Sequence, residues 1–238
     1  MNNKTNKALP LGNFNAINTI IKNSSSIKAI IFDLDGTIGE TVPLCIKAFK
    51  MSIEPLLGKE LSDEEIIATF GPSEEGTVKA LIPGQYEKGI KNYLKYYAEM
   101  HDMCPEPFDG ILTILTFLRS RNFILAMVTG KGEKSTAITL SKYKLNHLFD
   151  AVETGSISGP RKAEGIKNIL ERFCLAPQEA IYVGDAPGDI IAAREASIKI
   201  ISAAWSDTID QSKLIALRPD EIFYKIEDFK TYLLQNIR

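Results

Sequence analysis

The chain has 238 residues, of which 45% are hydrophobic and 24% charged, and its 28 Lys+Arg nearly balance its 30 Asp+Glu. This composition supports a sizeable core and excludes extensive disorder, while the formal net charge of −2 argues against a nucleic-acid-binding protein. No apolar run approaches the ~18 residues of a membrane span. The three widely spaced cysteines predict neither a disulfide framework nor a zinc site. We expect a cytoplasmic protein, monomer or homodimer, with no nucleic-acid or membrane partner.

The pattern along the chain alternates strands with helices. Residues 1–26 are rich in Asn, Ser and Lys and are predicted to form a leader. Residues 27–32 then form a short apolar, β-branched run that is typical of a buried parallel strand. Further strands are predicted at 123–128, 180–183 and 198–203, with weaker candidates at 151–152 and 221–224, and helices at 111–121, 133–143, 162–173 and 189–196. Such alternation predicts a doubly wound α/β sheet.

A stretch of different character separates the first strand from the second. Residues 42–104 show no convincing strand, and Ser62 with Glu65 forms a capping box at the start of one of three or four predicted helices. A βαβ crossover needs only about a dozen residues, so this stretch is predicted to be an inserted domain. We therefore expect a Rossmann-like core from 27–41 and 105–238, with an all-helical insertion over 42–104.

Acidic residues follow the predicted strands at the edge where such sheets bind ligands. Asp33 and Asp35 end the first strand, two apart and therefore on one side of an extended chain. Asp185 ends a later strand, and Asp189 follows four residues on. Converging carboxylates repel each other unless a hard divalent cation binds them, and such oxygen ligands suit Mg²⁺. The sequence therefore predicts a magnesium site.

Residues of another kind are predicted at the same edge. Thr129 supplies a hydroxyl at the end of the second strand, and Gly130 lets a ligand approach the backbone. Lys162 opens the helix that precedes the strand ending at Asp185. A lysine and a hydroxyl beside the predicted metal suit a phosphoryl group. The combination indicates a Mg²⁺-dependent phosphoryl-transfer centre in which an Asp can act as nucleophile.

These motifs resemble those of the haloacid dehalogenase superfamily. The four segments that carry the resemblance are 32–37 (FDLDGT), 128–130 (VTG), Lys162 and 184–189 (GDAPGD), in the order of that family. The likeness covers about residues 27–205, and the insertion over 42–104 resembles the helical cap of that superfamily. The set is specific, although DxD alone is a weak signal.

The resemblance implies a role for each acidic residue. Asp33 would attack phosphorus and form an aspartyl-phosphate, and Asp35 would protonate the leaving oxygen and then deprotonate the hydrolytic water. Asp33, Asp185 and the backbone carbonyl of Asp35 would bind Mg²⁺. Asp189 would support the metal or orient Lys162.

The resemblance also implies the phosphoryl-binding residues. Thr129 and Lys162 would hold the phosphoryl oxygens, beside Gly130. Because Arg161 precedes Lys162, either could be the phosphate-binding cation, and we favour Lys162 because its charge is compact.

The acid at Asp35 favours phosphomonoester hydrolysis, because dehalogenases and phosphonatases of this superfamily generally lack it. The helical cap and Phe70-Gly71-Pro72 look most like the phosphoglycolate phosphatase-like branch. We expect hydrolysis of a small phosphorylated metabolite resembling phosphoglycolate, a nucleotide or a sugar phosphate. The alternatives are a β-phosphoglucomutase-like isomerase and a non-catalytic module that carries a phosphorylated Asp33.

Overall fold

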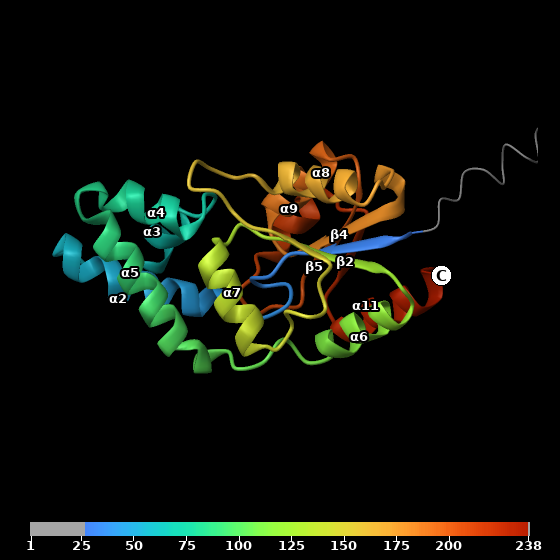
Figure 1. Cartoon of the computed structure of the whole chain (residues 1–238), viewed down its shortest axis with the longest axis horizontal. Coiled ribbons are helices and arrows are strands. Elements are labelled where there is room, and N and C mark those ends of the chain that lie inside the picture. The colour runs from blue at the N-terminus through green and yellow to red at the C-terminus, as the bar shows by residue number, and fades with distance from the viewer. Residues whose placement is uncertain (1–26, 238) are drawn as a thin grey trace, which may run out of the picture.

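The computed structural model describes residues 27–237, so the leader predicted over 1–26 lies outside the described residues. Within that range one sheet of six parallel strands runs in the order β3-β2-β1-β4-β5-β6, with helices on both faces (Figure 1). This arrangement confirms the predicted doubly wound α/β fold. The strands are β1 (Ala29–Phe32), β2 (Ile124–Val128), β3 (Ala151–Glu153), β4 (Ala180–Gly184), β5 (Lys199–Ala203) and β6 (Glu221–Phe223).

Ten α-helices complete the described part of the chain. They are α2 (Val42–Leu57), α3 (Asp63–Ile67), α4 (Glu74–Leu81), α5 (Tyr86–Glu99), α6 (Ile111–Ser120), α7 (Glu133–Lys142), α8 (Lys162–Arg172), α9 (Pro187–Glu195), α10 (Gln211–Leu217) and α11 (Ile226–Asn236). Short 3-10 turns lie at Pro83–Gln85, His101–Met103 and Pro177–Glu179. None of the helices between residues 27 and 237 combines the length and apolarity that a membrane crossing requires.

Strand β1 occupies the centre of the sheet. Its residue Ile30 is paired with Leu125 of β2 on one side and with Ile181 of β4 on the other. Because every pairing is parallel, the carboxyl ends of β1, β2 and β4 meet at one edge. The two weaker strand candidates, 151–152 and 221–224, correspond to the short outer strands β3 and β6.

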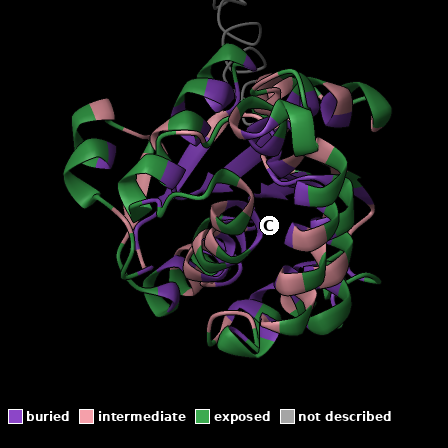
Figure 2. Cartoon of the chain, turned by 90° about the vertical axis from the view of Figure 1, so that its left-hand side faces the viewer, coloured by how far each residue is buried: buried purple, intermediate pink, exposed green. Residues whose placement is uncertain are grey.

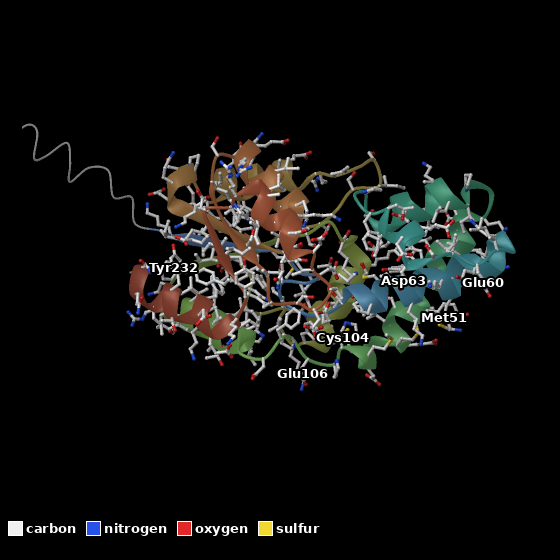
Figure 3. The ribbon with its side chains drawn as sticks, turned by 180° about the vertical axis from the view of Figure 1, so that it is seen from behind. Met51, Glu60, Asp63, Cys104, Glu106 and Tyr232 are labelled. Carbon is white, nitrogen blue, oxygen red and sulfur yellow. The ribbon has the colours of Figure 1, made fainter. Side chains whose placement is uncertain are left out.

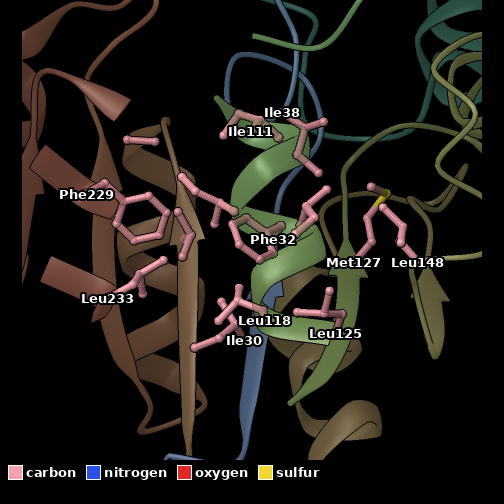
Figure 4. Close-up of a cluster of buried hydrophobic side chains, with 14 of the residues drawn as sticks. Ile30, Phe32, Ile38, Ile111, Leu118, Leu125, Met127, Leu148, Phe229 and Leu233 are labelled. Carbon is pink, nitrogen blue, oxygen red and sulfur yellow. The ribbon is translucent and has the colours of Figure 1, made fainter. Parts of the chain in front are cut away.

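The sheet is buried on both faces. Ile30 and Phe32 of β1 point to the face covered by α6 and α11, where Leu118 and Phe229 pack against them (Figure 4). Ala29 and the other odd-numbered positions of β1 point to the face covered by α8 and α9. Because both alternating sets of side chains are apolar, β1 reads in the sequence as a continuous hydrophobic run.

Residues 42–104, here called the helical lobe, contain helices and turns throughout and no strand. Apolar faces of α2, α4 and α5 form a separate core in which the ring centroids of Phe49 and Tyr93 lie 4.5 Å apart. Glu60 in this lobe and Tyr232 in α11 lie near opposite ends of the molecule (Figure 3). Exposed residues cover the outer faces of the helices, whereas the central strands are buried (Figure 2).

Two helices begin with residues that are typical of helix N-termini. The predicted capping box is confirmed, because Ser62 accepts from the Glu65 N–H while the Glu65 carboxylate accepts from the Ser62 N–H. Helix α9 begins at Pro187 rather than at the predicted Asp189. Proline fits the first turn of a helix because its missing N–H would have no partner there.

Candidate active site

Asp33 and Lys162 form an ion pair at the carboxyl end of β1. Lys162 Nζ lies 2.6 Å from Asp33 Oδ2 and also 2.6 Å from Asp189 Oδ1. The first residue of α8 is therefore held between a carboxylate that follows β1 and one in the first turn of α9. Asp33 Oδ1 accepts a second hydrogen bond from the Leu34 N–H at 2.7 Å, which fixes the carboxylate plane.

Three carboxylates converge at this point. Oxygen atoms of Asp33, Asp185 and Asp189 all lie within 4.8 Å of one another. Burial raises the pKa of Asp33 to about 7, although Lys162 acts in the opposite direction. Burial and then the neighbouring Asp33 raise the pKa of Asp185 well above its usual range.

This cluster fits a hard divalent cation. Oxygen donors suit Mg²⁺, and a cation bound there would relieve the repulsion between the buried carboxylates. Asp189 is already committed within the protein, because it accepts from Lys162, from the Tyr182 hydroxyl at 3.1 Å and from the Ala186 N–H at 2.8 Å. Asp33 accepts two hydrogen bonds, from Leu34 and Lys162, and Asp185 accepts one, from Thr37. Of the three carboxylates, Asp185 therefore keeps the most oxygen lone pairs for an ion.

The loop after β1 approaches Asp185 very closely. Gly36 has a φ of +77°, and a Cβ atom there would lie 2.2 Å from Asp185 Oδ2. The hydroxyl of Thr37 donates to Asp185 Oδ1 at 2.9 Å. Glycine is required at position 36 both for the left-handed backbone and for this contact.

The side chain of Asp35 turns away from the carboxylate cluster. Its Oδ1 accepts from the Thr41 hydroxyl and lies 3.4 Å from Lys131 Nζ. Lys131 Nζ also lies 3.1 Å from Cys45 Sγ and 4.2 Å from the centroid of the Tyr97 ring, both in the helical lobe. The carboxylate of Asp35 therefore contacts Thr41 and Lys131 and does not belong to the cluster of Asp33, Asp185 and Asp189.

Lys131 is a site residue that sequence reasoning missed. Its side chain is 2% exposed. Burial opposes its charge, but the attraction of Asp35 and other neighbours outweighs burial and keeps the pKa of Lys131 well above its ordinary value. The available signal was its position directly after the Thr129-Gly130 pair at the end of β2.

Thr129 and Gly130 lie where the strand pattern placed them. Both residues line the same cavity as Asp33, and the Thr129 side chain accepts from the Lys131 N–H at 3.2 Å. A Cβ atom on Gly155 would lie 1.9 Å from the carbonyl oxygen of Gly130. The loop after β3 thus packs directly against the loop after β2.

Arg161 and Lys162 take different directions. The Arg161 guanidinium donates to the Thr154 carbonyl at 3.2 Å and pairs with Glu153 at 3.3 Å and Glu164 at 3.0 Å. Of these two cations it is Lys162 that contacts Asp33. Which of the two binds phosphate stays a prediction from the sequence.

A cavity of about 940 Å³ lies between the carboxyl edge of the sheet and the helical lobe. It is larger than a single phosphate requires, and its size is that of pockets for small organic ligands. The core residues at its base include Asp33, Asp35, Thr129, Gly130, Lys131, Lys162 and Asp185.

Glu74, the first residue of α4, ties the lobe to the core. Its buried carboxylate accepts from the Gly132 N–H at 2.6 Å and from the Ser135 hydroxyl, both at the start of α7. Nearby, the Ser73 N–H donates to the Ser156 carbonyl at 2.9 Å. Two loops of the core therefore hold the lobe over the cavity.

Comparisons with known proteins show which proteins the chain is similar to. A family model described as haloacid dehalogenase-like hydrolase matches residues 30–203. Pyrophosphatase PpaX of Bacillus pumilus is 30% identical over 208 residues, 87% of this chain and 96% of the relative. Pyrophosphatase PpaX of Bacillus mycoides is 26% identical over 204 residues, 85% of this chain and 94% of the relative. A haloacid dehalogenase-like hydrolase from Streptococcus pneumoniae has a TM-score of 0.72 at 29% identity, covering 88% of this chain and 99% of that one.

Proposed function

This chain belongs to the haloacid dehalogenase-like hydrolase family, and on that basis we propose that it is a Mg²⁺-dependent phosphatase of small phosphorylated metabolites. The observation that carries the proposal is the placement of Asp33 at a strand end, paired with Lys162 and beside Asp185. A nucleophile, a cation for the phosphoryl oxygens and a metal-binding carboxylate thereby share one cavity.

The reaction has two steps at Asp33. A carboxylate oxygen of Asp33 forms a bond to phosphorus as the bond from phosphorus to the leaving oxygen breaks, and Asp35 gives its proton to that oxygen. Asp35 then takes a proton from water, which attacks the aspartyl-phosphate and releases phosphate and free Asp33. Bound Mg²⁺, held by Asp33, Asp185 and the backbone carbonyl of Asp35, would offset the charge of the phosphoryl oxygens.

Neighbouring side chains hold the phosphoryl group. Lys162 is fixed by Asp189, so its ammonium stays close to the oxygen atoms of a group that reacts with Asp33. Thr129 supplies a hydroxyl from the adjacent strand end. The helical lobe, residues 42–104, acts as a cap that limits the access of water to the site and contacts the leaving group.

The test is phosphate release from an aryl phosphate by the purified chain with Mg²⁺, with EDTA, and as the Asp33→Asn variant. We expect release that requires Mg²⁺ and is lost in the variant. Full activity in Asp33→Asn would overturn the proposal. A metabolite panel would include 2-phosphoglycolate, sugar phosphates, nucleotides and pyrophosphate, the last because two relatives are named pyrophosphatases.

The two alternatives give different results in the same assays. An isomerase of the β-phosphoglucomutase kind would interconvert sugar phosphates with little net release of phosphate. A non-catalytic module would accumulate a stable phosphorylated Asp33 without turnover. Either result would replace the phosphatase proposal.

A further inference from the structure

The lobe lines its side of the cavity with apolar and aromatic groups. The lobe residues that face the cavity are Val42, Cys45, Phe49, Phe70, Gly71, Pro72, Glu74, Thr77 and Tyr93. The lobe, all of which is described, therefore contributes no Lys or Arg to this lining. The charged residue in this set is Glu74, and its carboxylate accepts hydrogen bonds from Gly132 and Ser135 at the start of α7.

Three aromatic rings pack against one another on this side of the cavity. The ring centroid of Phe49 lies 4.5 Å from that of Tyr93 and 6.0 Å from that of Phe70. Phe49 and Tyr93 are buried, whereas Phe70, on the connection between α3 and α4, is 41% exposed. Ile191 of α9 also lines the cavity and is 50% exposed. Exposed large apolar groups beside a cavity are typical of ligand contacts.

The cations at the base of the cavity already have partners. Lys162 pairs with Asp33 and Asp189, and Lys131 faces Asp35. Arg161 likewise pairs with Glu153 and Glu164.

The rim formed by α8 and α9 carries both charge signs, because Lys167 lines the cavity together with Glu164 and Glu195. A second anionic group on the substrate would lose hydration against the lobe without gaining a dedicated cation there.

We propose that the substrate is a phosphate monoester whose leaving group is an uncharged alcohol that carries a flat aromatic ring, and that this ring stacks against Phe70, which packs on Phe49. Nucleoside 5′-monophosphates and aryl phosphates share this chemistry, and the cavity of about 940 Å³ accommodates both sizes. The inference rests on the proposed phosphatase function and selects the substrate class within it.

The first experiment compares kcat/KM of the purified chain with Mg²⁺ on five substrates. They are a nucleoside 5′-monophosphate, phenyl phosphate, pyrophosphate, 2-phosphoglycolate and glucose 6-phosphate. We expect kcat/KM for each of the two aromatic substrates to exceed that for the three others by at least about tenfold, because stacking on an aromatic side chain stabilises the bound ring. The ratio of kcat/KM for the nucleotide to that for phenyl phosphate shows which of the two leaving groups fits the cavity better.

The second experiment uses Phe70→Ala, a substitution at a half-exposed side chain outside the catalytic centre. We expect KM for the aromatic substrates to rise about 5- to 10-fold with little change in kcat, since only ring stacking is lost. The rates on 2-phosphoglycolate and pyrophosphate should stay unchanged. The matched control is Ile67→Ala, because Ile67 is similarly exposed in the lobe but does not line the cavity.

The outcomes separate this inference from the proposed function. Turnover of pyrophosphate, 2-phosphoglycolate or glucose 6-phosphate equal to or above that of both aromatic substrates overturns the inference and leaves the proposed phosphatase function intact. A Phe70→Ala effect that is the same on all five substrates also overturns it. Absence of phosphate release from every substrate, by folded protein with Mg²⁺, overturns the proposed function itself.

Discussion

The ammonium of Lys131 lies 3.4 Å from the carboxylate of Asp35 and is enclosed by Cys45 and Tyr97 of the lobe. Lys131 thus fixes the side chain that we assign as general acid and base.

We expect Lys131→Met to lower kcat by about 10- to 100-fold, because Asp35 loses the cation that orients it. The free energy of unfolding should fall by about 3 kcal/mol, as when one partner of a buried pair is removed. Steady-state kinetics and urea unfolding measure both effects. The control is Lys134→Met, at an exposed lysine of α7, which should change neither. Normal kcat in Lys131→Met would show that Asp35 needs no such partner.

The neighbouring cations Arg161 and Lys162 provide a second comparison. Lys162→Met should reduce kcat/KM by about 100-fold or more, because the phosphoryl group loses its nearest positive charge. Arg161→Met should stay within about threefold of the parent, since Arg161 bonds to the loop after β3 and to glutamates at the surface. Inhibition by inorganic phosphate gives an independent readout. Equal losses in both variants would contradict the assignment of Lys162.

The pKa of Asp33 makes the stability of the metal-free protein depend on pH. Burial raises this pKa from 3.8 to about 7, so the folded chain binds a proton between those values that the unfolded chain has released. Stability without metal should therefore fall as pH rises from about 4 to 7. Thermal unfolding in EDTA at pH 5 and pH 7 measures the change, and Asp33→Asn should reduce it. A metal-free protein that gains stability over this range would contradict the prediction.

Gly36 offers a test of the metal site with a matched control. Gly36→Ala would push a methyl group into Asp185 and strain the left-handed backbone. We expect the Mg²⁺ concentration for half-maximal activity to rise by about tenfold or more, a scale typical of disturbed metal-site support. Gly58→Ala is the control, because Gly58 has a φ of +67° with no atom within 4 Å of the added Cβ. If both variants shift the Mg²⁺ requirement equally, the contact with Asp185 is not responsible.

Much of this arrangement could be predicted because it depends on local patterns. Apolar β-branched runs located the central strands, and parallel strands place the residues after them at one edge, which brings Asp33, Thr129 and Asp185 together. The family membership inferred from the motifs is confirmed by the match over residues 30–203. The short edge strands were weak signals because three residues carry little periodicity.

The contacts between lobe and core could not be predicted in the same way. Lys131 becomes a site residue only because Cys45 and Tyr97 close around it, and no spacing in the sequence encodes that approach. The direction of the Asp35 carboxylate likewise depends on Thr41 and on the loop geometry. Side-chain direction depends on tertiary packing, which the pattern of strands and helices does not specify.

The carboxylate of Glu74 has a consequence for turnover. It accepts hydrogen bonds from the Gly132 N–H and the Ser135 hydroxyl at the start of α7. The N-terminus of this core helix is therefore capped by a side chain of the lobe. Swinging the lobe outward would uncap that helix, at a cost of about 0.5–2 kcal/mol. This is a weak latch. In the proposed reaction, such a latch would favour the enclosed arrangement during the chemical steps and would be weak enough for the lobe to open when product leaves.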